Sequence, residues 1–206
     1  MTTQRRRFFD GVSTALVIGH AVAAVGALAG GVLILVEESP LKVSLGMVTR
    51  PVEIGLYSLL ALHALLMLAM PLWSGLAARG QAGVSRLWAW LGYFIPLASY
   101  WLPAQTLQRL AMPRLADGAD AEAPRRRMLI VAWGVARGVA SPSFFVALVL
   151  VMLKMGTDSG MSGWIVIIYI FVAIFAANFL SLLMISQMRR HLLAATVDER
   201  HAEVFS

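Results

Sequence analysis

Four polar side chains lie deep inside long apolar segments of this sequence, where they could bind or transfer a polar species. They are His20, His63, Arg137 and Asn178. Counted from the predicted cytoplasmic end of its segment, each residue lies about nine to twelve positions inside. At about 1.5 Å per residue, this spacing predicts one polar layer near the middle of a bilayer. Such a layer could bind an anion, a lipid headgroup or a proton in transit.

A purely structural interpretation of the same four residues stays open. Single polar residues often join membrane helices by hydrogen bonds, each contributing roughly 0.6 kcal/mol. Helix rotation determines whether the four side chains meet, and the sequence does not specify it. The structural interpretation is therefore favoured over a binding site.

Arg137 is the most costly of the four residues. An arginine near the middle of a membrane helix costs about 2.5 to 3.5 kcal/mol on insertion scales. Gly134 and Gly138 bracket it and would let a second backbone approach closely. We predict that the Arg137 guanidinium caps carbonyl groups left without helical partners between Pro96 and Pro103. A role in transport or ligand binding and snorkelling to the interface are the alternatives.

The rest of the sequence offers little catalytic chemistry. Cysteine is absent, which removes thiolate nucleophiles and sulfur metal ligands. No phosphate-binding loop, nucleophile triad or pair of carboxylates is present. Asp198, Glu199, His201 and Glu203 lie in a polar tail without the convergent spacing of metal ligands. The sequence therefore predicts no catalytic residues, no cofactor, no metal site and no enzyme activity.

The composition indicates what must position the four polar residues. Of the 206 residues, 59% are hydrophobic and only 14% are charged, which is more apolar surface than one soluble core can bury. The net charge of +6 could suggest nucleic acid, but the arginines cluster at the ends of apolar segments. This placement excludes nucleic acid as a partner and predicts an integral membrane protein in a lipid bilayer.

Four apolar segments are long enough to cross a hydrocarbon layer about 30 Å thick. They cover residues 12–36, 52–76, 128–153 and 164–188, and the tail 189–206 is predicted to form a short cytoplasmic helix. Residues 4–9 also resemble a twin-arginine export signal, but the apolar segment that follows is longer than a signal-peptide core. The sequence therefore predicts one all-α membrane domain over residues 1–206 with four transmembrane helices.

The segment 87–110 could be a fifth span or a re-entrant hairpin. Pro96 and Pro103 each remove a backbone donor and are expected to bar a regular helix that runs through their positions. A hairpin places thirteen lysine and arginine residues in the cytoplasm and three outside, whereas a span gives six and ten. Because cytoplasmic loops carry the excess of positive residues, a proline-broken re-entrant hairpin with both termini cytoplasmic is favoured.

The hairpin segment also carries a recognisable motif. Its residues are Arg86, Trp88, Trp90, Gly92, Phe94, Pro96, Ser99, Trp101, Pro103 and Leu107. This motif resembles the bacterial membrane-protein family described as domain of unknown function 4328. Two positions depart from the family, since Ser99 replaces the usual asparagine and Leu102 replaces a common basic residue. The resemblance implies a membrane architecture without an assigned activity.

We therefore expect a multi-pass protein of the bacterial cytoplasmic membrane that acts as a non-enzymatic scaffold, assembly or sensor component. Its basic cytoplasmic surface would contact anionic lipid or a membrane partner, and homo-oligomerisation stays open. A small transporter or channel that uses the Arg/His/Asn layer is the alternative. A lipid-modifying enzyme is a third hypothesis, and it lacks an apparent set of acids, bases or metal ligands.

Overall fold

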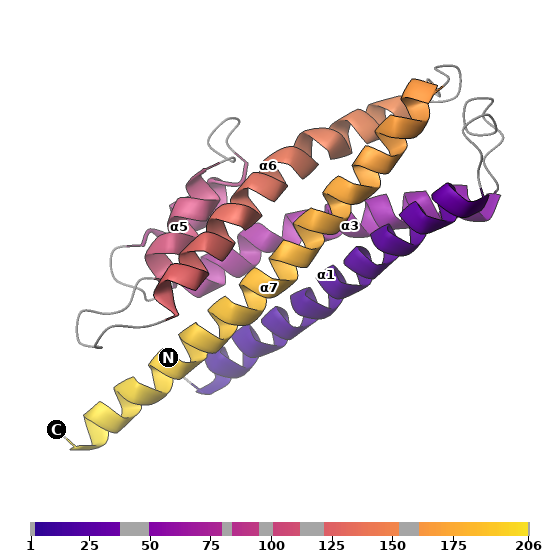
Figure 1. The fold of residues 1–206 in the computed structure, drawn as a ribbon. Helices are drawn as coiled ribbons and strands as arrows, with labels where there is room; N and C mark the ends of the chain where they lie inside the picture. Colours follow the sequence, from indigo (N-terminus) through magenta and orange to yellow (C-terminus); the bar gives the residue numbers. More distant parts are fainter. Residues whose placement is uncertain are drawn as a thin grey trace. The chain divides into compact units, whose positions relative to one another are not determined.

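Helices form all the regular structure in the computed structural model, which describes residues 3–37, 50–79, 84–94, 101–111, 122–152 and 161–205. They are α1 (Thr3–Glu37), α3 (Arg50–Ala78), α4 (Arg86–Leu91), α5 (Leu102–Ala111), α6 (Ala123–Met152) and α7 (Met161–Phe205) (Figure 1). No strand occurs within these ranges, so the prediction of an all-helical chain is confirmed.

The chain forms two compact units that share its long helices. Unit 1 comprises Met1–Ile18, Met67–Val135 and Leu180–Ser206. Unit 2 comprises Gly19–Leu66 and Ala136–Phe179. Helices α1, α3, α6 and α7 each contribute residues to both units, whereas α4 and α5 belong to unit 1 alone.

Exposed side chains on the long helices are mainly apolar, and several buried ones are polar. In α1, Val22 and Val25 are 57% and 67% exposed, whereas Ser13 and His20 are fully buried. A soluble protein shows the opposite preference, because water solvates its polar groups. Three segments, Gln4–Val36, Ile54–Ala78 and Ile168–Ala194, are long and apolar enough to cross a bilayer. Together these features indicate a membrane protein.

Three of the four predicted spans correspond to these segments. The fourth, predicted at residues 128–153, coincides with α6 up to Met152, and its passage through a membrane remains a prediction. The tail is not a separate short helix, because α7 continues without a break from Met161 to Phe205. No glycine or proline follows Gly163, and arginine is a good helix former, so nothing interrupts the helix after the last apolar turn.

Two short helices occupy the segment predicted as a hairpin. The ten residues of α5 span about 15 Å, which is too short to cross a bilayer. Pro103 lies in the first turn of α5, which begins at Leu102, and at this position the missing N–H costs no hydrogen bond. Pro96 and Ser99 lie outside the described residues, and a re-entrant path remains a prediction.

Small residues bring helices close together in unit 2. A Cβ atom built on Gly30 would lie 2.5 Å from Cε1 of Phe171, so a side chain at this position would displace the Phe171 ring. A Cβ atom on Gly26 would lie 3.6 Å from Cδ1 of Leu59, which is an ordinary contact. Only the first of these two glycines is therefore required by packing.

Substituting Gly30 with alanine is expected to lower the free energy of unfolding by about 1 to 3 kcal/mol, because the methyl group displaces the Phe171 ring. Gly26→Ala is the matched control on the same helix, with an expected change within about 0.5 kcal/mol. Reversible unfolding in mixed micelles with increasing dodecyl sulfate measures both. Equal losses in the two variants would contradict the close approach at Gly30.

Candidate functional site

Three of the four predicted polar residues meet inside unit 2. Asn178 on α7 lies between His20 on α1 and His63 on α3. Its Oδ1 atom is 2.8 Å from Nδ1 of His20, and its Nδ2 atom is 3.0 Å from Nδ1 of His63. All three side chains are at most 2% exposed. We refer to His20, Asn178 and His63 as the polar triad.

Helical periodicity places each triad residue on a buried stripe of its helix. Buried positions recur every three or four residues, as the 3.6-residue turn requires. The neighbours on these stripes are Leu16, Ala23 and Ala27 in α1, Leu59, Leu66 and Met70 in α3, and Ile174, Ser181 and Met184 in α7. The triad residues therefore lie on the same buried face of each helix as these small and apolar neighbours.

The Asn178 amide has one favourable orientation. Its Nδ2 atom also donates to the carbonyl oxygen of Ile174, one turn earlier on α7, at 2.7 Å. A flipped amide would place Oδ1 against that carbonyl, leaving two acceptors facing each other without a hydrogen between them. Nδ2 is therefore the donor to both Ile174 and His63, and Oδ1 is the acceptor from His20.

This orientation gives the two imidazoles opposite tautomers. Nδ1 of His20 carries a hydrogen and donates it to Oδ1, so neutral His20 has its lone pair at Nε2. Nδ1 of His63 accepts from Nδ2, so neutral His63 carries its hydrogen at Nε2. Nε2 of His20 is buried without a hydrogen-bond partner among the residues that the structure describes. The polar triad thus retains a buried acceptor on α1.

Arg137 belongs to the same unit as the triad. It is half-buried on α6. Its predicted contact with the backbone between Pro96 and Pro103 involves positions outside the described ranges and remains a prediction. Unit 2 therefore contains both the hydrogen-bonded triad and the positive charge of Arg137.

The chemistry available to the triad is limited. It contains no carboxylate, and its one amide is held in place by a backbone carbonyl. In the described part of the chain, no group of three His, Asp or Glu residues could hold a metal ion. The arrangement can join three helices, and Nε2 of His20 can accept one further hydrogen bond or a proton.

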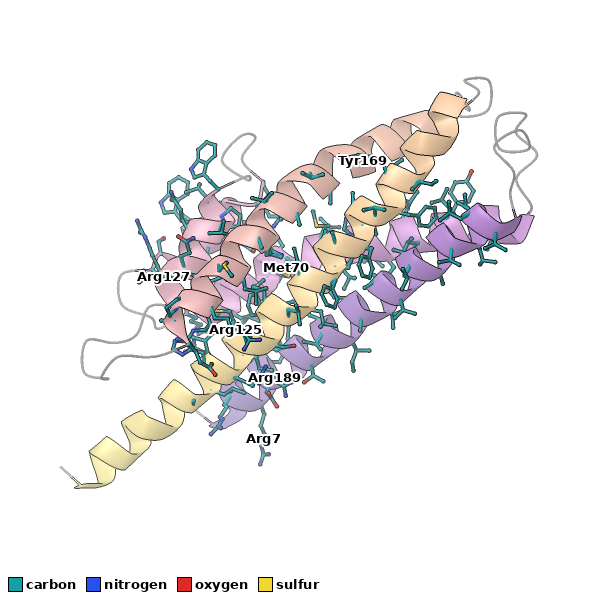
Figure 2. All side chains as sticks on the ribbon, viewed as in Figure 1. Arg7, Met70, Arg125, Arg127, Tyr169 and Arg189 are labelled. Atoms are coloured by element: carbon teal, nitrogen blue, oxygen red, sulfur yellow. The ribbon has the colours of Figure 1, made fainter. Side chains whose placement is uncertain are left out.

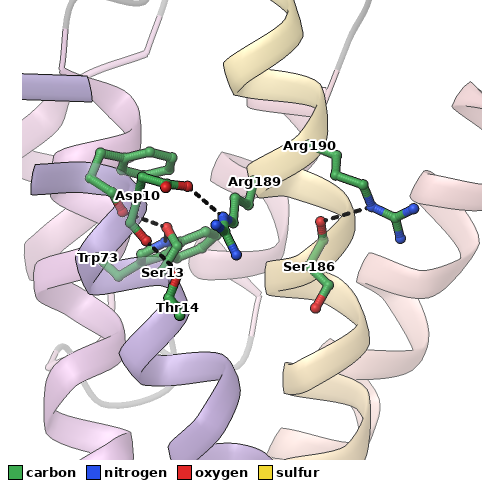
Figure 3. A network of polar contacts seen from close by, with 8 residues as sticks. Asp10, Ser13, Thr14, Trp73, Ser186, Arg189 and Arg190 are labelled. Atoms are coloured by element: carbon green, nitrogen blue, oxygen red, sulfur yellow. Dashed lines mark hydrogen bonds and ion pairs between the residues drawn. The ribbon is translucent and has the colours of Figure 1, made fainter. Parts of the chain in front are cut away.

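A second polar network, which the sequence did not predict, links α1, α3 and α7 in unit 1 (Figure 3). Nε1 of Trp73 donates to Oγ of Ser13 at 2.9 Å, and the indole stacks on Phe9 with ring centroids 6.2 Å apart. Nε of Arg189 donates to Oδ1 of Asp10 at 2.6 Å. These partners lie 60 and 179 residues apart in the sequence, so no local pattern indicates them.

Arginine side chains gather in unit 1. Every arginine whose side chain is described belongs to this unit, with the exception of Arg137. They are Arg5, Arg6, Arg7, Arg79, Arg86, Arg109, Arg125, Arg126, Arg127, Arg189 and Arg190, several of which are labelled in Figure 2. The acidic side chains described in unit 1 are Asp10 and Glu122, and each is paired with an arginine. Unit 1 therefore carries a positive excess that attracts anionic surfaces.

Comparisons of the chain with protein-family models, curated proteins and solved structures find no match. The functional argument therefore depends on the residues, contacts and charges of the chain itself.

Proposed function

We propose that this chain is a non-enzymatic membrane component, an assembly or sensor protein whose transmembrane helices are joined by the polar triad. The hydrogen bonds of Asn178 to His20 and His63 carry the proposal. These hydrogen bonds hold the three side chains in contacts between helices, although the same side chains could otherwise take part in chemistry. A buried network of this kind favours one helix arrangement, because any other would break the hydrogen bonds between these side chains.

The arginine-rich unit 1 supplies the second part of the proposal. Arg5 in the first turn of α1 and Arg189 in the later part of α7 belong to the same unit. Cytoplasmic segments of membrane proteins carry the excess of positive residues. Unit 1 therefore faces the cytoplasm together with both ends of the chain, and it contacts anionic lipid or a membrane partner.

A small transporter or channel is the second candidate, and one observation favours it. Nε2 of His20 is a buried acceptor with no partner among the described residues. Ionisable groups inside a membrane often mark ion or proton pathways. A role of this kind requires that water or a substrate reaches the triad.

Cysteine-accessibility labelling separates the two candidates, because the chain contains no natural cysteine. Single cysteines replace Arg7 and Arg127, which are exposed in unit 1, and Ala24, which is 5% exposed one turn from His20. A membrane-impermeant thiol reagent is applied from each side of oriented vesicles. We expect Arg7→Cys and Arg127→Cys to react only from the cytoplasmic side, and Ala24→Cys to react from neither side.

Denaturation in detergent provides the control, since Ala24→Cys must then react. Reaction of Ala24→Cys in intact vesicles would reveal a water-filled path along the buried face of α1 and would overturn the proposal in favour of transport. Reaction of Arg7→Cys from the outer side would show that unit 1 does not face the cytoplasm.

A further inference from the structure

Helices α4 and α5 form a groove in unit 1 with a volume of about 230 Å³. Trp88 and Leu102 contribute apolar surface, whereas Ser85, Gln105 and Arg109 contribute polar groups. Leu102, Gln105 and Arg109 lie on one face of α5, because they are spaced by three and four residues. Along that face, about 10 Å separates the apolar residue in the first turn from the arginine in the last.

The two helices around the groove and the turn residues next to them also expose large apolar side chains. Leu87, Trp88, Trp90, Phe94 and Trp101 are each at least 40% exposed. Water would solvate such a surface poorly, whereas tryptophan is enriched at the headgroup level of membranes. The exposure pattern therefore suits a position at the membrane interface, within reach of headgroups and acyl chains.

Arg109 gives the groove its charge. Its side chain is exposed in the last turn of α5, and none of the described residues that line the groove is acidic. A guanidinium group binds phosphate through two parallel hydrogen bonds. The Gln105 amide next to it can donate a further hydrogen bond. The groove thus offers cationic and donor groups at one end and apolar surface at the other.

We propose that the α4–α5 groove binds one anionic phospholipid, with the lipid phosphate on Arg109 and the upper part of an acyl chain on Trp88 and Leu102. The proposal deepens the proposed function, because it assigns a specific site to the lipid contact of unit 1. The charge of Arg109 selects an anionic lipid over a zwitterionic one. The apolar surface selects a lipid over a free phosphate ester.

Native mass spectrometry of the full chain in detergent tests this site with phosphatidylglycerol and phosphatidylcholine of identical acyl chains. We expect phosphatidylglycerol to bind about fivefold more tightly, which is the contribution of one arginine near a lipid surface. Arg109→Gln should abolish this preference, and Arg109→Lys should retain part of it. Arg86→Gln, which removes an exposed arginine outside the groove, is the matched control and should retain all of it.

Glycerol 3-phosphate distinguishes a lipid from a free phosphate ester, because it has the phosphate without the acyl chains. We expect it to bind at least about tenfold more weakly than phosphatidylglycerol. Equal binding of the two, an unchanged lipid preference in Arg109→Gln, or an equal loss in Arg86→Gln would overturn the proposal. None of these results would alter the labelling of Ala24→Cys, so failure of the groove is distinguishable from failure of the proposed function.

Discussion

Replacing Asn178 with leucine should lower the free energy of unfolding by about 2 to 4 kcal/mol. A buried polar group that loses its hydrogen-bond partner costs about 1 to 3 kcal/mol, and two such groups lose theirs here. The substitution removes the hydrogen bonds to His20 and His63, both of which are at most 2% exposed. Water cannot replace those bonds inside the packed helices. The loss should therefore exceed the roughly 0.6 kcal/mol of an average hydrogen bond between membrane helices.

The variant that replaces His20, His63 and Asn178 together with leucine is the matched control. It removes all three polar groups at once, and paired apolar replacements of similar size are nearly neutral. We expect its stability within about 1 kcal/mol of the wild type, measured by reversible unfolding in mixed micelles. A triple variant as unstable as Asn178→Leu would show that packing volume, and not hydrogen bonding, stabilises this part of unit 2.

Trp73→Ala should be the most destabilising single change in unit 1, with a loss of about 3 to 5 kcal/mol. The Trp73 side chain is completely buried, stacks on Phe9 and donates to Ser13. Alanine would leave a large cavity, and it would remove the indole N–H that donates a hydrogen bond to Ser13. Trp73→Phe keeps one aromatic ring but loses the rest of the indole together with its N–H, so its loss should be smaller, about 1 to 3 kcal/mol.

Trp101→Ala is the control for a tryptophan outside the core, because Trp101 is 50% exposed. Its effect on the free energy of unfolding should stay below about 1 kcal/mol. The three variants are compared by unfolding in mixed micelles, with far-ultraviolet circular dichroism as the signal. A loss in Trp101→Ala as large as that in Trp73→Ala would mean that Trp73 does not occupy the core of unit 1.

The positions of the long helices could be predicted from the sequence with good accuracy. The length of an apolar segment and the absence of interrupting residues are local properties, so three predicted spans recur as long apolar helices. The helix ends were less predictable. Helix α7 runs on to Phe205, because arginines end a hydrophobic segment without ending a helix. Helix α5 begins at Leu102 with Pro103 in its first turn, because the cost of proline depends on its position within the helix.

The sequence by itself determined that the chain is helical and apolar, and that a few polar residues inside the helices need partners. Only the tertiary structure decided which partners they have. Asn178 meets His20 across 158 residues and His63 across 115 residues. These contacts depend on how each helix is rotated about its axis, which packing between helices sets and no single segment encodes. The same holds for the tautomers of the two histidines, because they follow from an amide that the Ile174 carbonyl orients.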